Sequence, residues 1–461
     1  MSDYNFLMES RLSPEQFQVL NHLSRIAAER GLNLYLVGGA VRDLTYGQQI
    51  VRDLDFAVEG NPQRIFRRLS SSRSVVSSPA GLGAFASAAE SWGVAHLGFN
   101  ARLNAAEISF TNGVRAELAM CRNEVYTKPG RRPEIFPATI FEDLRRRDFS
   151  VNAMAISLHP NSRGLLLDPT NGAADIEKRE LRVLRNHSFL EDPSRIYRLL
   201  RLGLRLDFKP DAKTTNLVES ALKNRAWERL EPEQQRRELR AVLQEDQPGR
   251  VLKMLAQRGL LTGLSRKLAL ARIPYELFAK IRSVAQTVPR ADPFLLHFHC
   301  LIQKLGPSHA RRLAGKIIAD RKAIVTALRL KSDAQKVART LASSRAALPS
   351  QVYTLLSKQP QSLLLFLLVH YRQAKIHSRV KNFLCKYPLV RAKLPRAELQ
   401  AMGLKPGPQF EKIIEQVFLE QLDGKIKTHQ QLLKELRTLA GIKEPSPKPS
   451  KLVAGARPRK K

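Results

Sequence analysis

The chain has 461 residues, of which 43% are hydrophobic and 26% are charged, and its net charge is +35. This composition supports folded, water-soluble modules, about two to four at roughly 100–200 residues each, and excludes a wholly disordered chain. The three cysteines, Cys121, Cys300 and Cys385, are far apart and odd in number, which excludes a disulfide framework or a zinc knuckle.

Targeting signals are not evident at the beginning of the chain. The first residues, MSDYNFLMESRLSPEQ, lack a basic stretch followed by an apolar one. The apolar runs, such as 362–370 (SLLLFLLVH), are shorter than the roughly 20 residues that cross a bilayer. We therefore expect a cytoplasmic protein that has no membrane partner.

The positive charge is spread along the chain. The segment 442–461 holds seven Lys or Arg and one Glu, so it supplies only +6 of the +35. A body this basic should attract polyanions such as nucleic acid, with an affinity that falls steeply as salt rises. A solubilising surface is the alternative, but solubility needs far less charge.

The first part of the chain alternates predicted helices and strands. Residues 13–30 predict an amphipathic helix capped by Ser13, and 34–37 predict a strand that leads into Gly38 and Gly39. The remaining expected elements up to about residue 160 are helices at 40–46 and 62–69 and strands at 54–58, 96–99, 107–110 and 117–120.

From about residue 188 the pattern becomes helical and basic. Leu-rich segments with a period near 3.6 recur to about residue 440. The expected fold class is α+β: a mixed-sheet head, an all-helical basic body and a disordered basic tail. The expected domains are a catalytic head at 1–160, a helical neck at 161–255, a helical body at 256–441 and the tail at 442–461.

Asp53 and Asp55 are the strongest candidates for chemistry. They stand one residue apart on a predicted strand, so their side chains share a face, with Cα atoms roughly 7 Å apart. Two converging carboxylates repel each other unless cations lie between them, and Mg²⁺ prefers carboxylate and phosphate oxygens. Taken alone, the pair could also be two surface aspartates.

Two neighbouring features support the metal hypothesis. Gly38 and Gly39 separate a strand from a helix, and glycine lets the backbone approach a phosphate closely. Strand, two glycines, helix and then the Asp pair on the next strand is a nucleotidyltransferase arrangement. Glu117, on a further predicted strand, could complete the site as a third catalytic acid or could be an exposed carboxylate.

Five blocks in this order and spacing resemble the class II tRNA nucleotidyltransferases and bacterial poly(A) polymerases, over about half of the chain. They are LVGGAVRD at 36–43 with RDLDFAV at 52–58, EDLRRRDFSVNAMAI at 142–156, LLDPTNGAADIEKRELR at 166–182, FLEDPSRIYRLLR at 189–201 and, more weakly, LEPEQQRRELRAVL at 230–243.

The resemblance implies a role for each matching residue. It makes Asp53 and Asp55 the ligands of two catalytic Mg²⁺ ions, and it gives Glu117 a position where many members have Asp. The implied nucleotide-binding residues are Gly38, Gly39, Arg42, Asp43, Arg146, Arg147, Asp148, Asn152, Glu191, Asp192, Arg195 and Arg198.

Within the Glu191-Asp192-x-x-Arg195 motif, the resemblance implies a protein template for the incoming base. Glu191 and Arg195 are expected on one helix, where residues i and i+4 share a face, so the two can act together. Their carboxylate and guanidinium would then present acceptors and donors to a base edge. An ordinary surface salt bridge is the alternative interpretation.

Two other segments are relevant to the choice of substrate. Residues 122–137 fall at the family's flexible loop, where Gly130 and Pro133 fit a mobile segment. Residues 404–428 resemble a helical element of many tRNA-processing members, while a basic C-terminal tail also occurs among bacterial poly(A) polymerases.

His297 and His299 form no His-Asp pair, so we expect helix-packing histidines and no phosphohydrolase module.

The leading hypothesis is addition of CMP, AMP or both, from CTP and ATP, to a tRNA 3′ end. The alternatives are a poly(A) polymerase acting on other RNA 3′ ends, a catalytically inactive RNA-binding protein and a small-molecule nucleotidyltransferase. The intact acidic and glycine motifs oppose the inactive protein, and the charge and helical length oppose the small-molecule enzyme. The sequence leaves open the oligomeric state and the choice between whole CCA ends and a terminal A.

Overall fold

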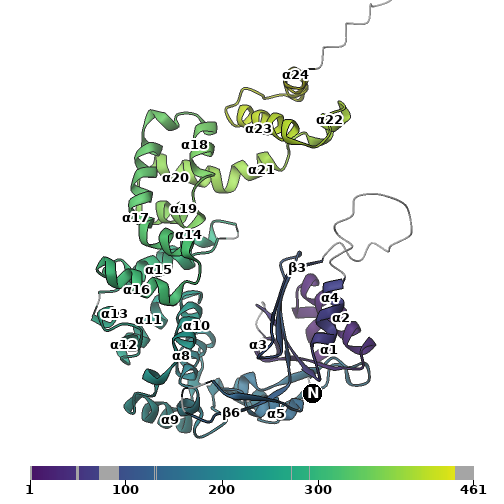
Figure 1. Ribbon diagram of the computed structural model, residues 1–461, viewed down its shortest axis with the longest axis vertical. Coiled ribbons are helices and arrows are strands. Elements are labelled where there is room, and N and C mark those ends of the chain that lie inside the picture. The colour runs from purple at the N-terminus through teal and green to yellow at the C-terminus, as the bar shows by residue number, and fades with distance from the viewer. Residues whose placement is uncertain are drawn as a thin grey trace, which may run out of the picture. The chain divides into compact units, whose positions relative to one another are not determined.

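The computed structural model describes residues 3–47, 51–71, 93–128, 130, 132–270, 272–289 and 291–441. The chain divides into two compact units, Met1–Arg272 and Ile273–Lys461. The first unit holds the sheet, and the second is helical throughout its described residues (Figure 1).

A seven-stranded mixed sheet forms the head of the first unit, with strand order β3-β4-β5-β2-β1-β8-β9. Neighbouring strands are antiparallel except β2 and β5, which are parallel. The strands are β1 (Asn33–Val37), β2 (Leu54–Glu59), β3 (Val94–Asn100), β4 (Ala105–Phe110), β5 (Arg115–Met120), β8 (Ala155–Ser157) and β9 (Leu166–Leu167).

Apolar side chains on both faces of β1 and β2 fix this sheet in the core. Leu36 and Phe56 are register partners on one face and are fully buried. Tyr35 and Ala57 are partners on the other face, in a cluster that includes Ile140. Helices α2 (Pro14–Glu29) and α4 (Gln63–Ser71) lie beside each other against the sheet (Figure 1).

The remaining helices of the first unit pack either on the sheet or on one another. Helix α3 (Gly39–Tyr46) follows β1 directly, and α5 (Ile140–Arg145) packs against β2. The others are α1 (Tyr4–Arg11), α6 (Gly172–Lys178), α7 (Ser188–Glu191), α8 (Ser194–Leu206), α9 (Ala212–Lys223), α10 (Pro232–Leu243), α11 (Pro248–Gln257), α12 (Leu261–Leu264) and α13 (Arg266–Leu270).

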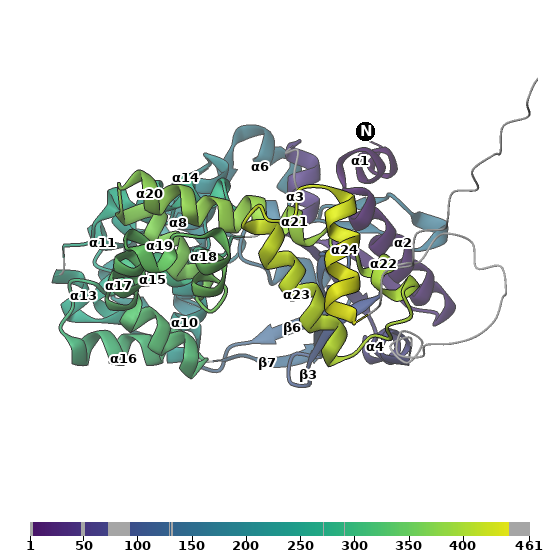
Figure 2. The same ribbon diagram turned by 90° about the horizontal axis from the view of Figure 1, so that it is seen from above.

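The second unit buries its own Leu- and Phe-rich core, and its last two helices pack side by side (Figure 2). Its helices are α14 (Tyr275–Gln286), α15 (Phe294–Ile302), α16 (Pro307–Ile317), α17 (Arg321–Ala342), α18 (Pro349–Leu356), α19 (Gln361–His370), α20 (Ala374–Lys381), α21 (Tyr387–Arg391), α22 (Arg396–Ala401), α23 (Pro408–Leu422) and α24 (His429–Ala440).

The fold class, a mixed-sheet head with a helical body, is confirmed. Helix α2 begins after Ser13, whose hydroxyl accepts from the Gln16 amide at 3.2 Å, and it ends before Gly31, which has a φ of +61°. The expected tail at 442–461 lies outside the described residues. Among the described helices, none is by itself long and apolar enough to cross a membrane, although α18 and α19, bent by 118°, pass that test as a pair.

Part of the segment 122–137, which is expected to be a flexible loop, forms paired strands in the structure. Strands β6 (Arg122–Val125) and β7 (Glu134–Pro137) form an antiparallel ribbon. The connection is also anchored, since the Gly130 amide donates to the Glu191 carbonyl at 3.0 Å. A Cβ on Gly130 would lie 2.7 Å from the Arg229 carbonyl oxygen, so glycine permits this close approach.

Candidate active site

A glycine turn begins the candidate site. Strand β1 ends at Val37, and Gly38 turns the chain into α3 with a φ of +69° that side chains rarely adopt. A Cβ at Gly38 would lie 3.1 Å from Arg147 Nη1 and 3.5 Å from Asp55 Oδ2. Gly38 therefore provides the turn and also leaves room for a guanidinium and a carboxylate against the backbone.

The sheet register gathers acidic side chains beside this turn. Asp55 on β2 is the partner of Val37 on β1 and of Glu117 on β5, and Glu117 is in turn the partner of Glu107 on β4. Partners in register project from the same face. The sheet therefore brings Glu117 beside Asp55, as the sequence had only suggested.

Asp53 lies just before β2, and its half-exposed side chain forms a 3.0 Å ion pair with Arg115. Asp55 is more enclosed. Burial, followed by the charge of Glu117, raises the pKa of Asp55 to about 7. Burial and the neighbouring carboxylate therefore disfavour the ionised form of Asp55.

The donor set fits a cation that is shared with a substrate. In the described residues, no three or more His, Cys, Asp and Glu side chains are arranged to hold a metal ion by themselves. Mg²⁺ commonly uses one or two carboxylates and takes its other ligands from water and phosphate. Asp53 and Asp55 suit that mode of binding, and a cation beside Asp55 would favour its ionised form.

Asp143 anchors the two arginines of the expected phosphate motif. Its Oδ1 accepts from Arg146 Nη2 at 2.6 Å and its Oδ2 from Arg147 Nη2 at 2.8 Å, while its side chain is 1% exposed. Burial alone would raise the pKa of Asp143, but Arg147 and Arg146 outweigh that effect and lower it to about 2. We did not expect this role from the sequence, although the i,i+3 and i,i+4 spacing is a signal for it.

A second set of polar contacts joins the turn helix to the segment after Arg147. Arg42 Nε donates to Oδ1 of its neighbour Asp43 at 2.8 Å, and Arg42 Nη1 donates to Asn152 Oδ1 at 2.6 Å. Asn152 in turn donates to Asp148 at 3.2 Å. These four residues, expected to bind nucleotide, lie in one connected network that includes no carboxylate of the metal set.

The Glu191–Arg195 motif does not lie on one helix, so the expected i,i+4 pairing of its ends is wrong. Helix α7 ends at Glu191, and α8 begins after Pro193, which lacks the backbone N–H that a continuous helix would use. Arg195 pairs with Asp192 instead, and Arg195 Nε lies 3.8 Å from Asp192 Oδ2. Asp192 is held by the Ser194 hydroxyl at 2.5 Å.

Arg198 connects the motif to the rest of the site. Its Nη1 lies 3.2 Å from Asp148 Oδ2, and its Nη2 lies 3.2 Å from Asp192 Oδ2. Its Nε lies 3.5 Å from Glu238 Oε1 on α10. Arg195 also donates to the Arg146 carbonyl at 3.1 Å. The structure thus places the residues expected near the phosphates and those expected near the base in one contiguous region of the first unit.

His297 and His299 pack within α15, as expected. Burial lowers the pKa of His299, whose Nδ1 lies 2.9 Å from the Ala327 carbonyl oxygen. The His297 ring lies 5.5 Å from that of Phe278, and the His299 ring lies 5.6 Å from that of Phe366. Both histidines belong to the core of the second unit.

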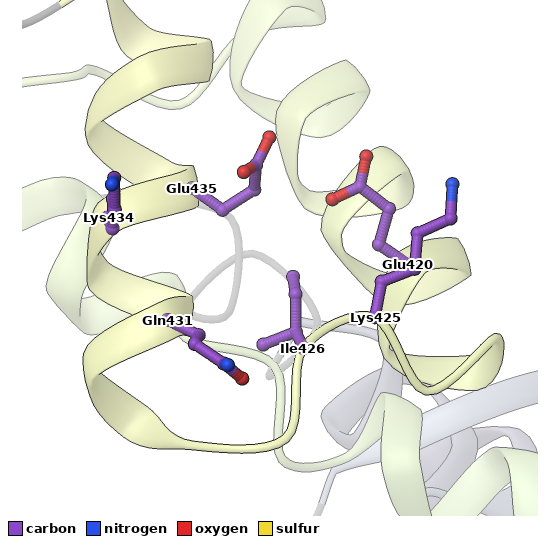
Figure 3. Close-up of a pocket in the computed structure, with 6 residues that line it drawn as sticks. All are labelled: Glu420, Lys425, Ile426, Gln431, Lys434 and Glu435. Atoms are coloured by element: carbon purple, nitrogen blue, oxygen red, sulfur yellow. The ribbon is translucent and has the colours of Figure 1, made fainter.

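The described part of the second unit carries surface hollows. One, of about 310 Å³ (Figure 3), lies between α23 and α24 and is lined by Glu420, Lys425, Ile426, Gln431, Lys434 and Glu435. Another, of about 350 Å³, is lined by Arg311, Arg321, Ile324, Val325, Leu328 and Arg329. The first mixes both signs of charge, whereas the second has three arginines around an apolar floor.

Comparison with known proteins identifies the head. Residues 34–182 match the family model described as the poly A polymerase head domain. An A-adding tRNA nucleotidyltransferase of Halalkalibacterium halodurans is 28% identical over 456 residues, which cover 95% of this chain and 96% of the relative.

Other relatives share only part of their length with this chain. An A-adding tRNA nucleotidyltransferase of Geobacter sulfurreducens is 25% identical over 92% of this chain, which spans 47% of that relative. A CC-adding tRNA nucleotidyltransferase of Deinococcus radiodurans is 36% identical over 55% of this chain and 62% of the relative.

Solved structures show the same fold. A structure described as a tRNA-processing enzyme (apo form I) aligns with a TM-score of 0.53 at 25% identity, over 89% of this chain and 98% of its own. A CCA-adding enzyme with CTP aligns with a TM-score of 0.51 at 25% identity, over 95% of this chain and 98% of its own. The head of this chain therefore matches the poly A polymerase head domain family, and the chain as a whole is similar to A-adding and CC-adding tRNA nucleotidyltransferases.

Proposed function

We propose that this protein is a nucleotidyltransferase that adds CMP, AMP or both to the 3′ end of tRNA without a nucleic-acid template. The observation that carries the proposal is the juxtaposition of Gly38, Asp55 and Arg147 in a poly A polymerase head domain. The names of the full-length relatives support tRNA as the substrate, and CTP in a similar solved structure supports the nucleotide. Poly(A) polymerase activity is the alternative.

The reaction would join the RNA 3′ oxygen to the α-phosphorus of the nucleotide, break the α–β phosphoanhydride bond and release pyrophosphate. Two Mg²⁺ ions held by Asp53 and Asp55 would supply charge neutralisation and activation of the hydroxyl. The Gly38 turn would admit the triphosphate, and Arg147, fixed by Asp143, would offer it positive charge. Arg42 and Asp43 would hold the turn helix in place.

Base recognition would fall to Asp192 and Arg195. Arg195 is buried, and its orientation is fixed by Asp192, Ser188 and the Arg146 carbonyl. A fixed guanidinium beside a fixed carboxylate presents donors and acceptors in a defined order, which a base edge must match. Arg198 would stabilise both Asp192 and Asp148 rather than contact the base itself.

The decisive experiment supplies tRNA transcripts that end before the first C, after C, after CC and after CCA, with each nucleoside triphosphate in turn. A CCA-adding enzyme extends every incomplete end and stops at CCA. An enzyme that adds only A extends the CC end alone. Long A tails on any of the ends, or on unrelated RNA, would establish the poly(A) polymerase alternative.

The helical body is proposed to hold RNA by its phosphates. In the second unit, Arg311, Arg321 and Arg329 line one hollow, and none forms an ion pair within the described part of the chain. Charges that are not neutralised by the protein are available to a polyanion. Phosphate contacts position RNA without reading its sequence, so many tRNAs should bind alike.

The salt dependence of tRNA affinity tests the proposed contacts to RNA phosphates. Replacing Arg311, Arg321 and Arg329 together by Gln should weaken tRNA binding and reduce the slope of log affinity against log salt, by about one for each phosphate that the variant no longer binds. Fluorescence anisotropy across a salt series would measure both quantities. Removing the tail after residue 441 should cost little affinity, because it carries only +6 of the +35.

A matched triple variant controls for the loss of net charge. Lys336, Arg391 and Arg396 already pair with Asp333, Glu415 and Glu411, so their replacement by Gln removes the same charge from the second unit. We expect this control to bind tRNA with nearly the wild-type slope. Equal losses in both triple variants would contradict a defined phosphate contact at the hollow.

A further inference from the structure

A positively charged side chain lies beside one of the two proposed metal ligands. Asp53 Oδ1 is 3.0 Å from Arg115 Nη2, and Arg115 is the one ion-pair partner of Asp53 among the described residues. The side chains of Asp53 and Arg115 are 48% and 71% exposed, so solvent and ions reach both. The guanidinium therefore contacts a carboxylate oxygen that a metal ion would use.

The register of the sheet places Arg115 at this position. Strands β2 and β5 are parallel, and Asp55 is the register partner of Glu117. Because successive side chains alternate between the two faces of a strand, Asp53 and Arg115, two residues earlier on each chain segment, extend the same row. The row therefore combines three carboxylates with one guanidinium, which lies at its more exposed end.

Arg115 differs from the other arginines near the acids in its freedom to move. Arg52, the residue before Asp53, is engaged elsewhere, since its Nη2 lies 2.5 Å from Asp246 Oδ2. Arg147 is largely buried and is fixed by a buried carboxylate. Arg115 has Asp53 as its only carboxylate partner in the described part of the chain, and most of its side chain lies in solvent. It is the guanidinium that can change partner when a ligand binds.

A free divalent cation and a metal–nucleotide complex interact with this arginine in opposite ways. A free cation at Asp53 either displaces Arg115 or lies close to a charge of the same sign, and both cost free energy. A nucleoside triphosphate carries more negative charge than one divalent ion neutralises, so its metal complex is still an anion. Arg115, once released from Asp53, can then pair with a phosphate oxygen of that complex.

We propose that Arg115 makes this site select a metal ion bound to nucleotide over a free metal ion. Arg115 holds Asp53 before the substrate binds, and it moves from the carboxylate to a phosphate when the metal–nucleotide complex arrives. The assignment rests on the proposed function for the identity of the nucleotide, but the binding that it predicts is measured without RNA and without nucleotide transfer.

The test compares the full-length wild type with Arg115→Gln, a substitution at an exposed position that should leave the fold intact. Proton relaxation enhancement gives Kd for Mn²⁺ alone, and isothermal titration calorimetry gives Kd for the preformed Mn²⁺–ATP complex. Arg115→Gln should bind free Mn²⁺ about two- to fivefold more tightly and the complex about two- to fivefold more weakly, because exposed ion pairs have effects of this size.

Two further variants control for charge. Arg225→Gln removes the same charge from the same unit at a similarly exposed arginine that pairs with Glu228, and it should leave both Kd values unchanged. Arg115→Lys keeps the charge beside Asp53 and should return both Kd values towards those of the wild type.

The outcomes separate this inference from the proposed function. Opposite shifts for free Mn²⁺ and for the complex, found in Arg115→Gln and absent from Arg225→Gln, support the inference even if the wild type transfers no nucleotide and the proposed function fails. Any other pattern overturns it, whether or not transfer occurs. Such patterns include equal shifts in both variants and no measurable binding of free Mn²⁺ by Arg115→Gln.

Discussion

Replacing either Asp53 or Asp55 by Ala is expected to abolish nucleotide addition while RNA affinity stays near the wild-type value. Asp55 faces Glu117 across the β2–β5 pair, and burial and Glu117 raise its pKa to about 7, so a bound cation would favour its ionised form. Metal stabilisation of a phosphoryl transfer contributes several kcal/mol, so turnover should fall by about a thousandfold or more. Single-nucleotide addition in Mg²⁺ and anisotropy with tRNA measure the two effects.

Glu107→Gln is the control for this experiment. Glu107 lies in the same row as Glu117, but it is exposed and two strands away from Asp55. It should retain turnover, which would show that the loss in the aspartate variants is not a general effect of removing an acid from this face. Near-normal turnover of Asp53→Ala or Asp55→Ala would refute the metal assignment.

Replacing Asp143 by Ala is expected to destabilise the first unit by about 3–5 kcal/mol, because it leaves two largely buried guanidinium groups without their shared carboxylate. Trp227 is buried in the first unit, and no tryptophan follows it in the sequence, so urea unfolding followed by tryptophan fluorescence reports on that unit. The exposed neighbour Arg145 is the control, and Arg145→Ala should change the free energy of unfolding by less than about 0.5 kcal/mol.

The effect of Asp143 should depend on pH in a defined direction. Its pKa is about 2 in the folded protein, below the value of about 3.9 that an unfolded chain would show. The carboxylate therefore stabilises the fold above about pH 4, and this contribution is lost as the pH falls towards 2. The difference in unfolding free energy between wild type and Asp143→Asn should shrink over that window, and a constant difference would argue against the ion pairs as its cause.

Several local features follow from the sequence alone. Ser13 and Gln16 form the capping box of α2, and the spacing of apolar residues placed strands at 34–37 and 54–58 within one or two residues of β1 and β2. A helix cap depends on residues close in sequence, and a strand is indicated by apolar residues at every second position. Both can therefore be predicted without knowledge of the tertiary structure. The motifs at 36–58 and 142–156 likewise indicate a poly A polymerase head domain, which residues 34–182 match.

Other features needed the tertiary structure, because they join residues that are distant in the chain. Only strand register brings Glu117 to Asp55, and only the packing of α5 on the sheet brings Arg147 against Gly38. The break at Pro193 removed the expected Glu191–Arg195 pair and left Glu191 to face Arg185. The net charge of the sequence predicts that the chain attracts a polyanion, but long-range pairing decides which charges are buried in ion pairs.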